Sequence, residues 1–132
     1  MRRDVEATRI LFGPGSARVT EAEAAKARAL AESMRRLTDS AAAIGASVRV
    51  ALVGRTDPTG TDATNQSLAA LRVDAVLRRL AAAGVPAALL DGRPVATAQP
   101  LQGADAEEQA RINRSVSFEA VVVIGPQAPR GP

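Results

Sequence analysis

Two oppositely charged residues, Asp57 and Arg72, have positions along the chain that could support ligand chemistry. Asp57 lies in the turn TDPTG, residues 56–60, directly after a strand-like run. Arg72 falls on the apolar arc of the predicted helix that follows, on a wheel of about 100° per residue. A guanidinium on a packing face is costly unless an anionic group meets it. Asp57 is the nearest anionic candidate in the sequence.

The two charges allow two interpretations. In the first, Asp57 and Arg72 form an ion pair that ties the turn to the helix, and Asn65 satisfies backbone groups. In the second, the charges stay apart and face a cleft, where they match a zwitterion: the carboxylate meets an ammonium and the guanidinium meets a carboxylate. Asn65 lies on the same helical line as Arg72, about 10 Å away along the axis. Spacing alone favours the ion pair.

The composition limits the chemistry that the chain can perform. It has no Cys and no His, which removes thiol nucleophiles, disulfides, the usual zinc sites and histidine general bases. We therefore predict no metal, no cofactor and no catalysis, with a carboxylate-only enzyme as a distant alternative. The net charge of +3, with 14 acidic residues interspersed, predicts no nucleic-acid partner. No apolar run reaches the roughly 18 residues of a membrane span.

Periodicity and breakers predict the elements that must position the two charges. A capping box, Thr20-x-x-Glu23, opens the first helix, which ends at Gly45. Residues 86–90 could form a strand, and Asp91-Gly92 is a turn signal. The predicted elements are strands at 8–12, 47–53 and 115–124, helices at 20–44, 62–83 and 104–112, and a third strand within 85–103. The order β-α-β-α-β-(α)-β predicts an α/β two-layer sandwich with its helices on one face of the sheet.

The stretch GRTDPTGTDATNQSLAALRVDAVLRRLAAAGV resembles the OmpA-like peptidoglycan-binding domain (OmpA C-terminal, Pal and MotB type), with its pattern G-H-T-D-x-x-G-x-x-x-x-N-x-x-L-S-x-x-R-A. Seven positions are in register: Gly54, Thr56, Asp57, Gly60, Asn65, Leu68 and Arg72. Upstream Ile10-Leu11-Phe12 resembles the family's first strand. Downstream Glu108 and Asn113-Arg114-Ser115-Val116 resemble its E-G-R-x-x-N-R-R-V stretch. The similarity covers about residues 8–120.

The resemblance implies a mixed four-stranded sheet and a non-catalytic function: binding of peptidoglycan through the diaminopimelate zwitterion of the stem peptide. It implies that Asp57 takes the ammonium and Arg72 the carboxylate. It also places Asn65 and Arg114 in the pocket, with Phe12 and Gly13 closing it. The implied location is the periplasm or cell envelope of a bacterium, where the domain would anchor a longer exported protein to the wall.

The predicted domain covers residues 8–124, with an N-terminal extension at 1–7 and a disordered Pro/Gly-rich tail at 125–132. Several positions depart from the family pattern: Arg55 replaces His, Ala69 replaces Ser, Ser115 replaces the second Arg, and residues 85–103 are unlike it. These departures leave a second hypothesis open, a protein-interaction or assembly domain on the same scaffold that has lost peptidoglycan binding. The sequence gives neither the parent protein nor the oligomeric state, so a homodimer also stays open.

Overall fold

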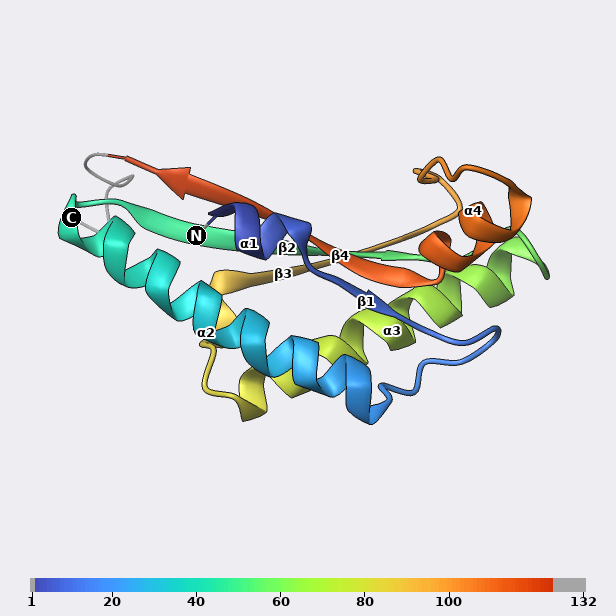
Figure 1. Ribbon diagram of the computed structural model, residues 1–132, viewed down its shortest axis with the longest axis horizontal. Helices are drawn as coiled ribbons and strands as arrows, with labels where there is room; N and C mark the ends of the chain where they lie inside the picture. The colour runs from blue at the N-terminus through green and yellow to red at the C-terminus, as the bar shows by residue number, and fades with distance from the viewer. Residues whose placement is uncertain (1, 125–132) are drawn as a thin grey trace.

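The computed structural model describes residues 2–124 and contains one mixed four-stranded sheet (Figure 1). The strand order is β1-β4-β2-β3; β4 is antiparallel to both β1 and β2, and β3 is parallel to β2. The predicted fold class is confirmed. The elements are α1 (Arg2–Ala7), β1 (Arg9–Leu11), α2 (Glu21–Ala43), β2 (Ser47–Arg55), α3 (Asp62–Ala82), the 3-10 helix η1 (Ala87–Leu89), β3 (Leu90–Ala96), α4 (Ala106–Asn113) and β4 (Ser115–Val123).

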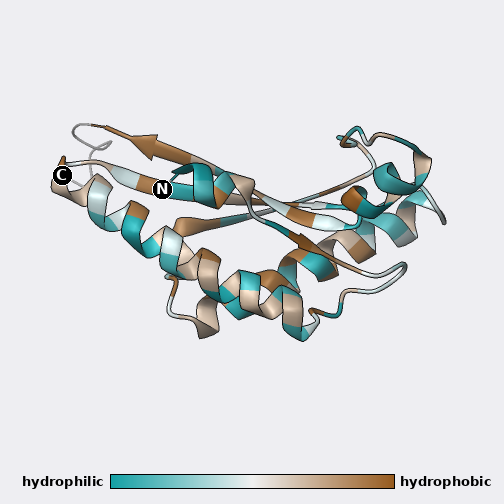
Figure 2. Ribbon diagram, in the orientation of Figure 1, coloured by the Kyte–Doolittle hydropathy of each residue, from teal (hydrophilic) through white to brown (hydrophobic). Residues whose placement is uncertain are grey.

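The core lies between the sheet and the two long helices, α2 and α3, which cover one face of it (Figure 1). Alternate residues of the two central strands, β2 and β4, point into this layer, and Leu52 stands opposite Phe118. Figure 2 shows hydrophobic and hydrophilic residues alternating along α2 and α3, as expected of helices with one buried face. Within residues 2–124, no helix is long and apolar enough to cross a membrane.

The outer edge of the short strand β1 is covered by side chains from α2. The Glu23 carboxylate accepts a hydrogen bond from the Leu11 amide at 2.6 Å, and the Lys26 ammonium donates to the Arg9 carbonyl at 3.1 Å. The Thr20 hydroxyl accepts from the Glu23 amide, as the capping box predicts. The Glu23 carboxylate, however, serves the strand edge, where it blocks pairing with a further strand.

Residues 85–96 differ from the sequence prediction. Most of the segment 86–90 forms η1, and Asp91 and Gly92 lie inside β3 and do not form a turn. The reason is packing: a Cβ on Gly92 would stand 2.8 Å from the Val73 side chain of α3. Glycine is needed here so that helix and strand can approach closely. In the sequence alone, the Asp91-Gly92 pair is indistinguishable from a turn signal.

Residues 2–7, which the sequence analysis left outside the domain, form α1 against α2 and β4. Val5 is fully buried in the core. The Glu6 carboxylate accepts from the Ala120 amide at 3.0 Å, on the part of β4 that β1 does not reach. The helix therefore covers a second stretch of sheet edge. The predicted tail, 125–132, lies outside the described residues.

Candidate functional site

The turn between β2 and α3 places Asp57 in the wall of a cavity of about 210 Å³. Asp57 Oδ1 accepts the Thr59 amide at 3.1 Å, a local bond that fixes the turn. The Thr61 hydroxyl then accepts the Thr64 amide and caps the start of α3. The cavity is lined by Gly15, Thr56, Asp57, Thr59, Gly60, Thr64, Asn65, Leu68 and Arg72.

Arg72 is completely buried, with 0% of its surface exposed, as its position on the apolar arc predicts. Three backbone carbonyls accept from its guanidinium: Nε donates to Ser16 at 2.8 Å, and the terminal nitrogens donate to Arg55 at 3.0 Å and Gly13 at 3.1 Å. The Phe12 ring centroid lies 5.3 Å from the guanidinium carbon, within the range of a cation–π contact. Carbonyl dipoles and a ring face thus compensate the buried charge.

These contacts use only part of the hydrogen-bonding capacity of the Arg72 guanidinium. A guanidinium has five N–H donors, and three are used, so each terminal nitrogen keeps one. Burial lowers the pKa of Arg72 to about 10, although the Asp57 charge acts against this shift. The side chain is therefore still charged at neutral pH and can meet an anion in the cavity.

Asp57 is paired with Arg114, at 3.3 Å between Oδ2 and a terminal guanidinium nitrogen. Within residues 2–124, no ion pair joins Asp57 to Arg72, so the ion-pair interpretation of these two residues is wrong. Burial alone would raise the pKa of Asp57, but hydrogen bonds from Thr59 and the contact with Arg114 outweigh it. The pKa of Asp57 therefore lies below its usual 3.8, and the carboxylate is ionised at neutral pH.

Arg114 connects the site to the loop that follows β1. Its Nε donates to the Phe12 carbonyl at 3.2 Å, and its own carbonyl accepts from the Phe12 amide at 2.8 Å. Arg114 supports Asp57 from behind and does not line the cavity. Phe12 and Gly13 also lie behind the cavity, where they contact Arg72. Of this loop, Gly15 is the residue that lines the cavity.

One buried polar group in the cavity, the Thr56 hydroxyl, has no hydrogen-bond partner among the described residues; Thr56 is 3% exposed. Asn65, which is 5% exposed, lines the same cavity. Most buried polar groups in proteins are paired, so such exceptions indicate a ligand or water. The geometry thus brings together all six predicted residues, three in the cavity and three behind it.

Sequence reasoning did not select Thr56 and Thr59 as site residues. Thr56 directly precedes Asp57 and is one of the seven positions in register with the family pattern, a signal that could have indicated its place in the cavity. Thr59 donates to Asp57 from both its amide and its hydroxyl. The Asp-x-Thr spacing is typical of such a turn and could have indicated this role.

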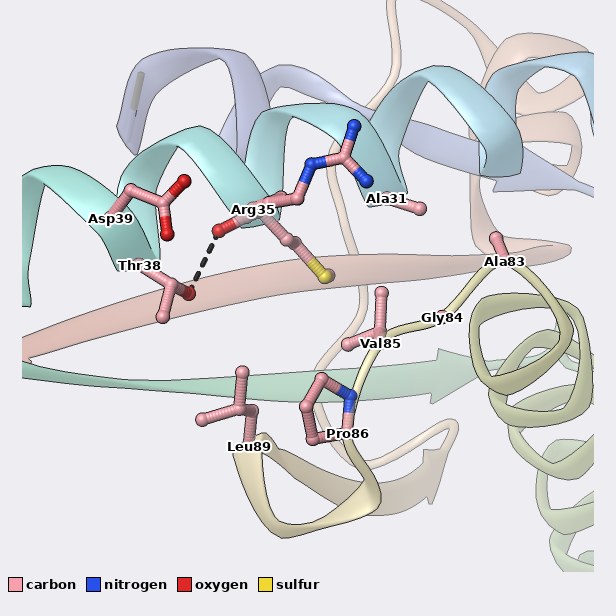
Figure 3. Close-up of a pocket in the computed structure, with 10 residues that line it drawn as sticks. Ala31, Arg35, Thr38, Asp39, Ala83, Gly84, Val85, Pro86 and Leu89 are labelled. Atoms are coloured by element: carbon pink, nitrogen blue, oxygen red, sulfur yellow. Dashed lines mark hydrogen bonds between the residues drawn. The ribbon is translucent and has the colours of Figure 1, made fainter.

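A second cavity, of about 260 Å³, lies between α2 and the connection from α3 to β3 (Figure 3). Its walls are mostly apolar, with Val85, Pro86 and Leu89 facing α2. The charged residues that line it, Arg35 and Asp39, are exposed, and Arg35 already pairs with Glu32. The residues that line this cavity include no buried charged group. The cavity with Asp57 and Arg72, where buried ionised groups converge, is therefore the better candidate for a functional site.

The candidate site lies within a match to a known protein family. The family model described as OmpA matches residues 11–114, a range that contains the six predicted site residues. The chain belongs to the OmpA family. Domains of this family are non-catalytic binding domains that are generally associated with peptidoglycan. No sequence among curated proteins is detectably similar to this OmpA-family chain.

Solved structures share the fold of this OmpA-family domain. The peptidoglycan-associated lipoprotein of Burkholderia pseudomallei matches with a TM-score of 0.68 and 22% identity, over 86% of this chain and 89% of that one. The periplasmic domain of Helicobacter pylori MotB matches with a TM-score of 0.67 and 20% identity, over 89% and 72%. The OmpA-like domain of FopA1 from Francisella tularensis matches with a TM-score of 0.61 and 16% identity, over 92% and 74%.

Proposed function

We propose that this domain binds peptidoglycan through the distal zwitterion of diaminopimelate, with Asp57 holding the ammonium and Arg72 the carboxylate. One observation carries the proposal. The same cavity of about 210 Å³ is lined by a buried guanidinium with two unused donors, an ionised carboxylate, and the unpaired Thr56 hydroxyl. An amino-acid head group supplies the missing partner to each of them.

The donor and acceptor inventory fits this head group. A ligand ammonium has three donors, and the acceptors around the cavity are the Asp57 carboxylate, the Thr56 hydroxyl and the Asn65 amide oxygen. A ligand carboxylate would accept the two unused N–H groups of Arg72. Each charge-assisted hydrogen bond contributes about 1.5–3 kcal/mol, so one site binds modestly. Anchoring of a periplasmic protein to the cell wall would come from many weak contacts with a polymer.

The test is a calorimetric titration with two stem tripeptides that differ at one residue. L-Ala-γ-D-Glu-meso-diaminopimelate carries the distal zwitterion, whereas the lysine tripeptide carries only the distal ammonium. We expect saturable binding of the first, and binding of the lysine peptide weaker by about tenfold or more, since it lacks the carboxylate that meets Arg72. Equal binding of both peptides, or none by folded protein, would refute the proposal.

Asp57→Asn is the variant that tests the site directly. Asparagine keeps an acceptor for the Thr59 bonds but removes the charge that meets the ammonium. We expect a loss of about tenfold or more in affinity for the diaminopimelate tripeptide, measured on protein that circular dichroism shows to be folded, since the variant also loses the ion pair with Arg114. Wild-type affinity in this variant would rule out Asp57 as the ammonium ligand.

The alternative, an assembly domain on the same scaffold, has one observation in its favour. Apolar side chains are exposed near one end of the sheet, where β4 ends beside the start of β2: Ile44, Val121, Val123 and Ile124. Exposed apolar groups that gather in this way often mark protein contacts. Sedimentation equilibrium over a range of concentrations would test this alternative, which predicts self-association that Val121→Gln weakens.

A further inference from the structure

A hollow of about 300 Å³ lies along β1 and shares no lining residue with the cavity of Asp57 and Arg72. The end of α1, the strand β1 and the helices α2 and α4 all contribute to its walls (Figure 1). Three cationic side chains line it, one each from β1, α2 and α4: Arg9, Lys26 and Arg111. Its lining residues include no acidic side chain. The hollow therefore presents positive charge from three separate elements.

Arg9 is the cation of this hollow that has no partner. Its Nε atom is buried, yet its guanidinium makes no hydrogen bond and no ion pair within residues 2–124. In that part of the chain only two side-chain atoms are both buried and unpaired, Arg9 Nε and the Thr56 hydroxyl. The Thr56 hydroxyl belongs to the cavity described above, whereas Arg9 lines the hollow along β1. A buried donor of this kind calls for an acceptor that the described residues do not supply.

The charge balance around the hollow favours an anionic ligand. Lys26 Nζ pairs with the Glu23 carboxylate at 2.9 Å. Arg111 pairs with the Glu108 carboxylate, also at 2.9 Å. These two pairs are neutral, so the single positive charge of Arg9 stays uncompensated. Lys26 uses two of its three N–H donors, and one terminal nitrogen of Arg111 donates to no described residue. An anion in the hollow would balance Arg9 and meet these unused donors.

We infer that the hollow along β1 binds a phosphate group, with Arg9 as the principal contact and Lys26 and Arg111 beside it. A guanidinium matches the spacing of phosphate oxygens and binds two of them at once. Donors from three elements reach the hollow from different sides, which suits the tetrahedral oxygens of phosphate better than the two coplanar oxygens of a carboxylate. Leu11 and Ile112 line the same hollow and would contact the carbon atoms of a phosphate ester. This site is independent of the proposed peptidoglycan site.

The experiment is an NMR titration of the whole chain, labelled with nitrogen-15, at constant ionic strength. The probes are inorganic phosphate, glycerophosphoglycerol, which is the soluble headgroup of a phospholipid, and acetate. We expect a saturable shift of the Arg9 Nε–H signal with a phosphate compound, and binding of acetate weaker by about tenfold.

Variants assign the binding to this hollow, with the backbone amides of β1 and α4 as the signals. Arg9→Gln should weaken phosphate binding by about tenfold or more, and Arg111→Gln, at an exposed position, by about threefold. Arg49→Gln is the matched control, because Arg49 is an exposed arginine of the same sheet that does not line the hollow, and it should leave binding unchanged. Circular dichroism of each variant shows whether the fold is intact.

Each outcome either supports or overturns the site. A shift with both phosphate compounds supports a phosphate ester as the ligand, and a shift with inorganic phosphate alone supports free phosphate. No shift with either compound would overturn the site, and equal affinity for acetate would overturn the choice of phosphate. Unchanged binding by folded Arg9→Gln, or an equal loss in Arg49→Gln, would show that general surface charge and not this hollow attracts the anion.

Discussion

At the scale of single residues, Arg72 serves the fold and the candidate site together. Its guanidinium holds the loop after β1 through the carbonyls of Gly13 and Ser16 and reaches the end of β2 through Arg55. The same group lines the cavity beside Asp57. A structural role and a ligand role are therefore not alternatives here, because five donors are enough for both.

The first prediction is that Arg72→Ala destabilises the fold strongly, by about 3–5 kcal/mol. It removes a large buried side chain and leaves three carbonyls without their donor. Urea denaturation would measure the change in the free energy of unfolding. Arg79→Ala is the matched control, since Arg79 is exposed on the same helix, and it should change stability by less than about 0.5 kcal/mol. A loss below about 1 kcal/mol for Arg72→Ala would contradict this structural role.

The second prediction concerns pH. Because the folded-state pKa of Asp57 lies below its unfolded value of 3.8, its stabilising contribution is complete above pH 3.8 and is lost as pH falls through the lowered value. Binding of an ammonium needs the ionised carboxylate and should follow the same course. We expect tripeptide affinity to hold from pH 7 to about pH 4.5 and to fall only in stronger acid. A loss already centred near pH 5 to 6, with the fold intact by circular dichroism, would show that Asp57 is not protected.

At the scale of elements, the site depends on how closely α3 lies against the sheet. A Cβ on Gly54 would stand 2.5 Å from a methyl of Val73 and 2.8 Å from the Ala69 carbonyl. The missing side chain of Gly54 lets the helix that carries Arg72 approach the strand that leads to Asp57. Gly54, which does not line the cavity, thus allows the close packing of α3 on β2 on which the site depends.

The third prediction follows from this contact. Gly54→Ala should cost about 1–3 kcal/mol of stability and should weaken tripeptide binding, because the helix must shift away from β2. Gly92→Ala should cost less, since its new Cβ meets side chains alone, Val73 at 2.8 Å and Leu77 at 3.7 Å, whereas at Gly54 a backbone carbonyl is also too close. Urea denaturation and calorimetry would rank the two variants. The reverse order would show that the backbone contact is not what limits the packing.

At the scale of the whole molecule, segments far apart in the sequence meet at the site. The loop 12–16, the turn 56–60, helix α3 and the junction of α4 with β4 are joined by Arg72 and Arg114. Side chains of α2 cover the edge of β1, and α1 covers the edge of β4 that β1 leaves free. This side of the sheet is therefore protected from pairing with a further strand. The helix α1 is therefore part of the packed structure.

The fourth prediction tests that role of α1. Val5→Ala should lower the free energy of unfolding by about 1–2 kcal/mol, because two buried methyl groups are lost from the core. Arg3→Ala, at an exposed position of the same helix, should have little effect. Equal stability of the two variants in urea would indicate that α1 does not contribute to the core.

The sequence by itself determined the local features. Alternation predicted β2 and β4, a cap and a glycine bounded α2, and the helical wheel placed Arg72 on the buried arc of α3. The turn with Asp57 and the motif spacing selected the right part of the chain. These features depend on residues within a few positions of one another, where the period of a helix or strand relates sequence to geometry.

Only the tertiary structure determined which residues contact each other at the site. The Arg72 partners at Ser16 and Gly13 are backbone carbonyls 56 and 59 residues away, and the Asp57 partner, Arg114, is 57 residues away. Every residue has a carbonyl, so no sequence pattern shows which ones a buried guanidinium will find. Tertiary packing also decided where β3 begins, because the close contact between α3 and the sheet leaves no room for a side chain at Gly92. It likewise left the Thr56 hydroxyl without a hydrogen-bond partner beside the cavity.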